Sequence, residues 1–182
     1  MTATTWKTDT IADILSEEFY ALIDRNREHI RKTFPVTLRG CKDLESTKKF
    51  IGEAIDNQIW SENFYFYIRH IASNNLIGYI VVENINMDIS KCELGYFVDK
   101  DFEGQGIISQ SVANALNYCF GELQMNKIII CTSRTNTASQ RVATKHGFIQ
   151  EGILREEFKN IDGVLEDIVY FGLLKSAYHN ER

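Results

Sequence analysis

GYFVDKDFEGQGIISQSV, residues 95–112, leads from an apolar run into a helical pattern through a turn that contains Gly104 and Gly106. A helix that opens after such a turn leaves its first main-chain N–H groups without partners inside the helix, and the helix dipole adds to their attraction for an anion. Glycine lets a phosphate approach amides that a Cβ atom would shield. Residues 103–109 are therefore predicted to form a cradle for a pyrophosphate group.

Three classes of phosphate-bearing ligand use a turn of this kind. A P-loop needs GxxxxGK[ST], and no lysine follows the glycines here. A dinucleotide fingerprint needs a third glycine where Ser109 stands and an acidic residue at the end of the next strand, whereas Glu122 falls at the end of a predicted helix. Coenzyme A agrees better with the order of the predicted elements. From these residues alone, an ordinary strand-to-helix turn without a ligand is favoured.

The composition predicts a single globular domain over residues 1–182. The chain has 182 residues, of which 44% are hydrophobic, and only one proline, so it is long enough to bury a sizeable core. The formal net charge of −5 argues against a nucleic-acid partner, because nucleic-acid-binding domains usually carry a basic excess.

The sequence predicts neither a membrane segment nor a metal site. The longest apolar stretch, residues 76–82, is too short to span a bilayer, and the N-terminal segment lacks the apolar core of a signal peptide. The histidines are dispersed without the spacing of metal ligands, and the cysteines form no CxxC. Cys92, Cys119 and Cys131 stand in apolar runs, which predicts small buried side chains in a reducing compartment. We therefore expect a cytoplasmic protein.

Periodicity and turn signals define the order of the elements. Apolar residues at helical spacing predict helices over residues 11–29, from 46, over 107–123 and over 137–146. Strand patterns cover residues 64–71, 76–83, 92–98, 127–132, 148–159 and 165–174. The order αα-βββ-α-β-α-ββ predicts an α+β fold with a mixed, mostly antiparallel sheet flanked by helices. One parallel crossover is expected, from the strand at 92–98 to the strand at 127–132.

Single residues mark the ends of several of these elements. Ser46 and Asn136 suit the N-caps of two helices, and Gly147 suits the position after a helix C-terminus. Asp162-Gly163 is a favoured pair for a hairpin turn between the last two strands.

Three stretches, ELGYFVDKDFEGQGIISQSV, IIICTSRTNTASQRVATKHGFIQEGILRE and DIVYFGLLKSAY, resemble the GNAT acyltransferases. Within that superfamily they resemble the ribosomal-protein N-terminal acetyltransferases of the RimL/RimJ type. The match spans residues 90–178, and LIDRNREHIRKTFP at residues 22–35 resembles the same branch. The resemblance implies the GNAT acyl-CoA N-acyltransferase fold, acetyl-CoA as the acyl donor and an amine as the acceptor.

The resemblance also implies roles for the residues around the glycine turn. The family's phosphate motif is Gln/Arg-x-x-Gly-x-Gly/Ala, and a chain aligned on Gly106 departs from it at Glu103 and Ile108. Glu103 is expected to point away from the phosphates. The cofactor-binding residues of the turn are then Gly104, Gln105, Gly106, Ile107 and Ile108. Phe97 and Val98, which end the preceding strand, are expected to pair main chain to main chain with the pantetheine arm.

A second motif, Asn136-x-x-Ser139 followed by Gly147, implies further roles. In related enzymes the asparagine contacts the coenzyme A arm, and in the RimL-like branch a serine matching Ser139 is the acid that protonates the leaving thiolate. Many superfamily members use a tyrosine four residues before the glycine, but Ala143 stands at that position here. Read without the resemblance, Asn136 is an N-cap and Ser139 a first-turn residue.

The chemistry of acetyl transfer suggests the remaining candidates. The amine must be neutral to attack, and deprotonation at pH 7 costs a lysine about 3–4 kcal/mol more than an α-amino group. Glu93 is the candidate base, because superfamily members often place a base in this strand, and a solvated or ion-paired glutamate is the alternative reading. Glu157 and Asp167 are weaker candidates. A main-chain N–H near Val98 is expected to donate to the oxyanion, and Tyr170 is expected to pack.

The sequence therefore predicts an acetyl-CoA-dependent N-acetyltransferase. The expected acceptor is a protein N-terminal α-amino group, of the ribosomal-protein type. A small amine, such as a polyamine or an amine-bearing antibiotic, is the alternative acceptor, and a non-catalytic coenzyme A sensor is the alternative from another class. By analogy with related proteins, we expect a homodimer or a higher homo-oligomer, with no direct contact to nucleic acid or membrane.

Overall fold

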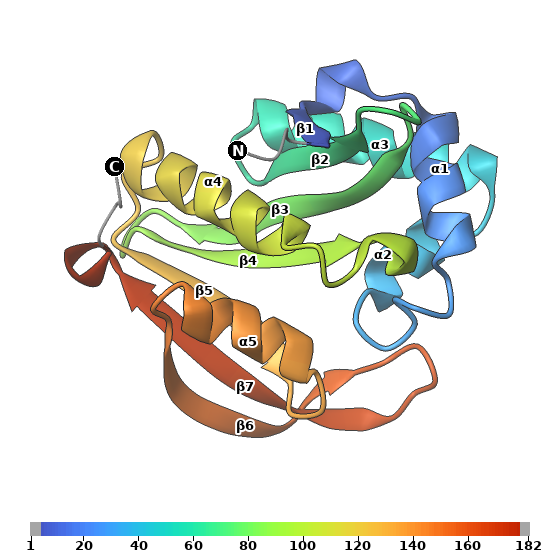
Figure 1. The fold of residues 1–182 in the computed structure, drawn as a ribbon. Helices are drawn as coiled ribbons and strands as arrows, with labels where there is room; N and C mark the ends of the chain where they lie inside the picture. Colours follow the sequence, from blue (N-terminus) through green and yellow to red (C-terminus); the bar gives the residue numbers. More distant parts are fainter. Residues whose placement is uncertain (1–4, 179–182) are drawn as a thin grey trace. The chain divides into compact units, whose positions relative to one another are not determined.

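A computed structural model describes residues 5–178 of the chain (Figure 1). Its strands form one sheet with the hydrogen-bonded order β1-β2-β3-β4-β5-β7-β6. The chain divides into two compact units. Unit 1 contains the residues up to Val81 together with Tyr96–Ile107, and unit 2 contains Val82–Gly95 together with the residues from Ile108 onward. Within residues 5–178, no helix is both long enough and apolar enough to cross a membrane.

The bounds of the elements agree with most of the predicted ranges. The strands are β1 (Trp6–Asp9), β2 (Phe64–His70), β3 (Leu76–Asn86), β4 (Lys91–Val98), β5 (Lys127–Ser133), β6 (Ile149–Lys159) and β7 (Leu165–Leu174). The helices are α1 (Ser16–Arg25), α2 (Pro35–Gly40), α3 (Leu44–Ile59), α4 (Ile107–Gly121) and α5 (Thr137–Lys145), with 3-10 turns η1 (Ile11–Asp13), η2 (Lys100–Phe102) and η3 (Lys175–Ala177). The predicted strands, and the predicted helices other than the first, are confirmed to within a few residues at each end.

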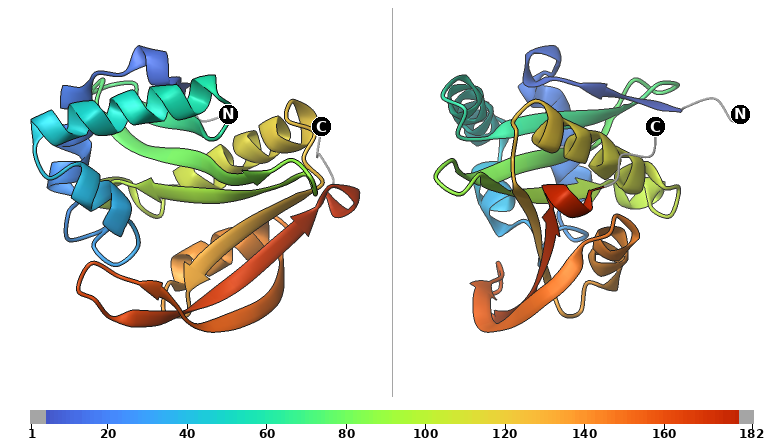
Figure 2. Two further views of the ribbon diagram at one scale, coloured as in Figure 1. Left: turned by 180° about the vertical axis from the view of Figure 1, so that it is seen from behind. Right: turned by 90° about the vertical axis from the view of Figure 1, so that its left-hand side faces the viewer.

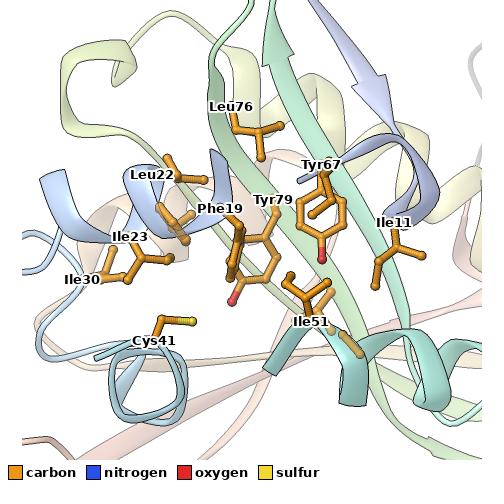
Figure 3. Packing of buried hydrophobic residues seen from close by; sticks show 14 of the residues in the cluster. Ile11, Phe19, Leu22, Ile23, Ile30, Cys41, Ile51, Tyr67, Leu76 and Tyr79 are labelled. Atoms are coloured by element: carbon orange, nitrogen blue, oxygen red, sulfur yellow. The ribbon is translucent and has the colours of Figure 1, made fainter. Parts of the chain in front are cut away.

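Unit 1 is built around a core of aromatic and branched side chains between its helices and strands (Figure 3). The ring of Phe19 on α1 meets the rings of Tyr67 on β2 and Tyr79 on β3 edge-on, with centroids 5.7 and 5.5 Å apart. Edge-to-face pairs of this kind add to the stability that the buried area provides. Phe97 on β4 belongs to the same cluster, with its ring centroid 5.2 Å from that of Tyr79. The core therefore fixes the C-terminal end of β4, the strand that leads into the glycine turn.

The first predicted helix, over residues 11–29, is wrong in its extent. The chain forms η1 and then α1, because Ile14 and Leu15 between them are extended. The main-chain N–H of Leu15 donates to the carboxylate of Glu18 at 3.1 Å, which fixes a new helix start. At the other end, α1 stops at Asn26, whose side chain turns back to donate to the carbonyl of Leu22 at 2.9 Å.

Other corrections concern short elements and one cap. The strand β1 and the helix α2 were not predicted from the sequence. The N-cap of α3 is Asp43 and not Ser46, because the Asp43 carboxylate accepts the N–H of Ser46 at 2.7 Å. The predicted cap at Asn136 is confirmed, since its side chain accepts the N–H of Ser139 at 3.1 Å.

A buried ion cluster ties β1 to β2 and α1 in unit 1. Arg69 on β2 and Asp9 on β1 are each 4% exposed and form a salt bridge. The same guanidinium donates to both carboxylate oxygens of Glu18 on α1, at 2.8 and 3.0 Å. These bonds raise the pKa of Arg69, so the guanidinium is charged at every relevant pH. Each charge is paired, as burial requires.

Unit 2 contains the parallel crossover that the sequence predicted. β4 pairs with β5 in parallel register from Lys91↔Lys127 to Glu93↔Ile129, and β5 and β6 each pair with β7 in antiparallel register. The pairing with β5 ends at Glu93, although β4 itself continues to Val98. The hairpin between β6 and β7 turns at Gly163, whose φ of +82° is in the left-handed region, which confirms the predicted turn.

One face of the strands in unit 2 carries the helices (Figures 1 and 2). Cys92 on β4 lies on this face, where its thiol is hydrogen-bonded to Cys119 on α4. Side chains alternate along a strand, so Glu93 points to the opposite face. Ile129 on β5 is the register partner of Glu93, and Cys131, two residues further along β5, lies on the same face as Glu93. Tyr170 on β7 is the register partner of Cys131 and so lies on this face as well.

Candidate active site

The glycine turn has the backbone that a main-chain anion site requires. Gly104 and Gly106 have φ values of +72° and +78°, in the region that side chains disfavour. A Cβ atom built at either glycine would meet no heavy atom within 4 Å, so the space in front of the turn is open. α4 begins at Ile107, which leaves the first amides of this helix without intrahelical acceptors. These residues fit the diphosphate of coenzyme A, which they would hold through main-chain N–H groups.

Side chains from the end of α1 anchor the loop before the turn. The amide oxygen of Asn26, a residue only 1% exposed, accepts the N–H of Lys100 at 3.0 Å. The guanidinium of Arg25 donates to the carboxylate of Asp99 and to the carbonyl of Leu76. Burial alone would raise the pKa of Asp99, but the hydrogen bonds from Arg25 and from the N–H of Asp101 outweigh it and lower that pKa. Asp99 is therefore an ionised anchor.

His29 stands beside both Val98 and Glu103 in unit 1. Its Nε2 lies 3.2 Å from the carbonyl oxygen of Val98 and 3.5 Å from the Glu103 carboxylate. The Glu103 side chain is 55% exposed. The histidines are dispersed along the sequence, and the 69 residues that separate His29 from Val98 hide this contact from any local pattern.

Phe97 and Val98 can offer a ligand only their main chain. Both residues are buried, and the Phe97 ring packs against Phe34 and Tyr79 in the core of unit 1. On the neighbouring strand, a Cβ atom built at Gly78 would lie 2.5 Å from the carbonyl oxygen of Phe97. The absence of a side chain at Gly78 therefore permits the close approach of β3 to this part of β4.

In unit 2, Asn136 and Ser139 meet at the start of α5. The side-chain oxygen of Asn136 caps the helix through the N–H of Ser139, so the reading of Asn136 as an N-cap is confirmed. Ala143, at the position where many relatives of this type carry tyrosine, is fully buried. Ser139 stays the acid that the sequence motif predicts on this helix.

A second contact links α4 to α5. Ser109 Oγ lies 3.0 Å from Nε2 of His146, the C-cap residue of α5. Burial lowers the pKa of His146, with a smaller opposing effect of its hydrogen bond to Ser109. The imidazole is therefore neutral at physiological pH. Ser109 stands where a dinucleotide fingerprint would need a glycine, and its hydroxyl contacts His146 instead.

Glu93 belongs to a row of polar side chains on the helix-free face of unit 2. Its carboxylate accepts the amide N–H of Asn84 at 2.9 Å and is hydrogen-bonded to the thiol of Cys131. Cys131 is in turn bonded to the hydroxyl of Tyr170, which also donates to Glu157 at 3.4 Å. Burial is the first cause of the raised pKa values of Cys131 and Tyr170, so the thiol and the phenol are both neutral.

This row corrects two predictions from the sequence. Cys92 and Cys119 are buried as expected, but Cys131 is only half-buried and is part of a polar network. Tyr170 does not simply pack, since its hydroxyl bonds to Cys131 and Glu157. Asp167 lies apart from this row: it accepts the N–H of Glu156 at 3.1 Å and pairs with Arg134 at 3.4 Å.

Glu83 on β3 is a further titratable residue that sequence reasoning missed. Burial, and then the charge of Glu93, raise the pKa of Glu83 to about 7. The only signal in the sequence is a single acid at the end of the apolar run 76–82. Among residues 5–178, no cluster of three or more histidine, cysteine, aspartate or glutamate side chains is arranged to hold a metal ion.

Comparison with known protein families decides what kind of protein carries these features. A family model described as "Acetyltransferase (GNAT) domain" matches residues 10–149. The chain belongs to the GNAT acetyltransferase family. This match confirms the fold and the family that the sequence motifs predicted. As a GNAT enzyme, the chain is an N-acetyltransferase that takes its acetyl group from acetyl-CoA.

Several curated relatives of this GNAT chain are named as acetyltransferases. It is 35% identical to a putative ribosomal N-acetyltransferase, YdaF, of Bacillus subtilis over 59% of this chain and 58% of the relative. It is 31% identical to a probable N-acetyltransferase, YjcK, of the same organism over 84% of both chains. A spermidine N(1)-acetyltransferase of Vibrio cholerae is 30% identical over 63% of this chain and 65% of the relative.

Solved structures agree in fold with this GNAT chain. A ribosomal-protein-S5-alanine acetyltransferase from Vibrio fischeri superposes with a TM-score of 0.86 over 99% of this chain and 98% of the other, at 19% identity. RimL, a ribosomal L7/L12 α-N-protein acetyltransferase solved with coenzyme A, gives a TM-score of 0.84 over 97% of this chain and 98% of the other, at 20% identity.

Proposed function

We propose that this GNAT enzyme acetylates the α-amino group of a protein N-terminus, of the ribosomal-protein type. The observation that carries the proposal is the 35% identity to a relative named as a putative ribosomal N-acetyltransferase. A ribosomal-protein-serine acetyltransferase of Escherichia coli, 26% identical over 82% of this chain and 83% of the relative, supports it. An α-amino group, with a pKa of about 7.7–8.0, also needs little help to become neutral at physiological pH.

Acetyl-CoA supplies an activated acetyl group in this reaction, and the protein binds the cofactor and orients that group. We assign the diphosphate to the main-chain amides from Gly104 to Ile108. The end of β4, beyond its register with β5, is assigned to the pantetheine arm through the main chain of Phe97 and Val98. Asn136 is assigned to the same arm. The open space at both glycines and the buried side chains of β4 support these assignments.

The sequence motifs also assign the residues that transfer protons. Ser139 gives a proton to the thiolate as the C–S bond breaks, and Glu93 accepts the proton that leaves the amine. A main-chain N–H near Val98 donates to the carbonyl oxygen as it becomes negative. The buried Ala143 supports the choice of Ser139, because it excludes the tyrosine acid used by many relatives.

Thiol release tests the reaction and its acceptor. The purified enzyme is given acetyl-CoA with N-terminal peptides of ribosomal proteins, spermidine or an aminoglycoside, and mass spectrometry locates the acetyl group. We expect release of thiol with at least one peptide and an acetyl group on its α-nitrogen. Turnover with spermidine alone would instead establish a polyamine enzyme, which the Vibrio cholerae relative makes the second candidate. Tight binding of coenzyme A without any turnover would indicate a sensor.

The Ser139→Ala variant tests the assigned acid. We expect its kcat to fall roughly 10²-fold or more while its Kd for coenzyme A stays the same. Unchanged turnover would refute the assignment. We further propose that the protein acts in the cytoplasm as a homodimer or a higher homo-oligomer, and light scattering on a sizing column measures that assembly.

A further inference from the structure

Glu83 and Glu93 lie on the same face of adjacent strands. Tyr79 and Val81 on β3 and Phe97 on β4 belong to one core cluster. The alternation of side chains therefore places Glu83, two residues after Val81, and Glu93, four residues before Phe97, on that face as well. β3 and β4 are neighbours in the sheet, so the two carboxyl groups belong to one local group.

The two carboxyl groups have different surroundings. The carboxyl group of Glu93 accepts a hydrogen bond from the amide of Asn84 at 2.9 Å and is hydrogen-bonded to the thiol of Cys131. The left-handed φ of Asn84, +52°, interrupts the alternation of β3 next to Glu83 and allows its amide to reach Glu93. Glu83 is half-buried at the end of the apolar run of β3. Burial and the charge of Glu93 are what raise its pKa.

We propose that Glu83 and Glu93 act as a carboxyl pair in acetyl transfer, in which Glu93 receives the proton of the acceptor amine and Glu83 holds it. This inference rests on the proposed function, and it adds to it a positioning residue that acts through Glu93. Two carboxyl groups at close range cannot both ionise easily, so the proton stays on the one with the poorer solvation.

The proton balance of this step closes through the site and water. The N–H bond of the amine breaks as its nitrogen bonds to the acetyl carbon, and an O–H bond forms on Glu93. That proton passes to Glu83 when Glu83 is ionised, which leaves Glu93 ionised and able to accept again, and Glu83 then releases the proton to water. The thiolate that leaves with the C–S electron pair takes its proton from Ser139, which regains one from water. The proton that Glu83 releases balances the one that Ser139 regains, so no other reactant is needed.

Other charged and titratable groups lie in the same row of side chains as the pair. Lys91 lies on β4, Cys131 on β5, Tyr170 on β7 and Glu157 on β6. Cys131 and Tyr170 stay neutral, because burial raises the pKa of each above the physiological range. The pair is therefore the part of this row that exchanges protons near neutral pH.

Carboxyl NMR on the whole protein tests the pair without any turnover. In protein labelled with ¹³C at the glutamate side-chain carboxyl carbon, we expect one resonance with a midpoint near pH 7. It should be absent in Glu83→Gln and should shift to lower pH in Glu93→Gln. The control is Glu151→Gln, since Glu151 pairs with Lys127 at 2.6 Å on β5 and should leave this resonance unchanged. No resonance titrating above about pH 6 would overturn the pair.

The pH profile of kcat tests its role in the reaction. We expect Glu83→Gln to lower kcat at pH 7 by about 10-fold or more and to shift the acidic limb of the profile, while the KM for acetyl-CoA stays the same. The acidic limb of the profile can arise from titration of the enzyme or of the substrate amine. Measuring the profile with two peptides whose α-amino groups differ in pKa distinguishes the two, because only a limb caused by the substrate moves with the peptide. An unchanged profile, in a variant whose NMR confirms the loss of the resonance, would overturn the catalytic role. Failure of every amine to react would instead count against the proposed function.

Discussion

Glu83 is a half-buried acid at the end of the apolar part of β3. Its pKa in the folded protein is raised to about 7, because burial and the charge of Glu93 both disfavour its carboxylate. In the unfolded chain the same group titrates near its ordinary value of 4.5. The folded state therefore binds the proton more tightly than the unfolded state between these two pH values.

The consequence is a loss of stability as pH rises. The contribution of protonated Glu83 is fully present below about pH 4.5 and is lost as pH rises through 7. Glu83→Gln should therefore be more stable than the wild type at pH 8, by an amount on the order of 2 kcal/mol, and should lose this advantage at pH 5. Urea unfolding at both pH values measures the difference. An equal difference at pH 5 and pH 8 would contradict the prediction.

Gly106 is required for its backbone conformation and not because a side chain would clash with its neighbours. Its φ is +78°, yet a methyl group there would touch nothing within 4 Å. We expect Gly106→Ala to cost about 1–2 kcal/mol in stability from the left-handed backbone alone. Its Kd for coenzyme A should also rise about 10-fold or more, because the methyl group shields the amides. Calorimetry with coenzyme A, beside urea unfolding, separates the two effects.

Gly52 provides the matched control for this substitution. It lies in the middle of α3, and a Cβ atom there also meets nothing within 4 Å. Gly52→Ala should stabilise the helix by about 0.5–1 kcal/mol and leave the affinity for coenzyme A unchanged. If Gly106→Ala bound coenzyme A as the wild type does, the glycine turn would not be the diphosphate site.

At the scale of the elements, β1 and α1 are held to β2 by the charges around Arg69. Asp9→Ala would leave the buried guanidinium with Glu18 as its remaining carboxylate partner and with the carbonyl of Asn74 at 2.7 Å, and we expect a cost of about 3 kcal/mol. Arg69→Met removes the charge that the carboxylates surround. Because each single variant already removes the salt bridge between Asp9 and Arg69, the double variant Asp9→Ala/Arg69→Met should lose less than the sum of the two, by about 1–3 kcal/mol. Additive losses in urea unfolding would show that the ion pair contributes no coupling.

The elements that sequence patterns predicted are those with strong local signals. β5 reads as a continuous apolar strand, and α5 is bracketed by Asn136 and Gly147, so both follow from a few residues. β1 has the polar sequence WKTD, and its strand conformation comes from pairing with β2 and from the bond between Asp9 and Arg69. Such tertiary causes lie outside any local pattern.

In the candidate site, too, local motifs were predictable from the sequence and long-range contacts were not. The glycine turn and the start of α5 are local motifs, and sequence reasoning found both. The contacts that it missed join residues far apart in the chain, such as His29 to Val98 and Asn26 to Lys100, which are separated by 69 and 74 positions. The pair of Glu83 and Glu93 depends on which residues of two strands face each other, and the left-handed Asn84 makes that register hard to predict.

At the scale of the whole molecule, the two compact units are continuous through β3, β4 and α4. The strands β3 and β4 would each have to break for one unit to unfold alone. We therefore predict that residues 1–182 form a single domain that unfolds in one cooperative transition. The coverage of residues 10–149 by one family model, across the boundary of the units, supports this prediction.

Buried native cysteines report on each unit separately. Cys41 belongs to unit 1, and Cys92 and Cys119 belong to unit 2, and all of them are 0% exposed. In pulse labelling of thiols along a urea series, with peptides resolved by mass spectrometry, all of them should become reactive at the same urea midpoint. A lower midpoint for Cys41 would show that unit 1 unfolds first and that the chain comprises two domains.

The position of β1 also matters for handling the protein. β1 is the edge strand beside β2, whose sequence FYFYIRH is rich in aromatic residues. If β1 were trimmed or displaced by a fused tag, the backbone of β2 would become an open template for pairing with other chains. Preparations truncated before residue 10 should therefore precipitate on concentration, whatever happens to their acetyl-CoA site.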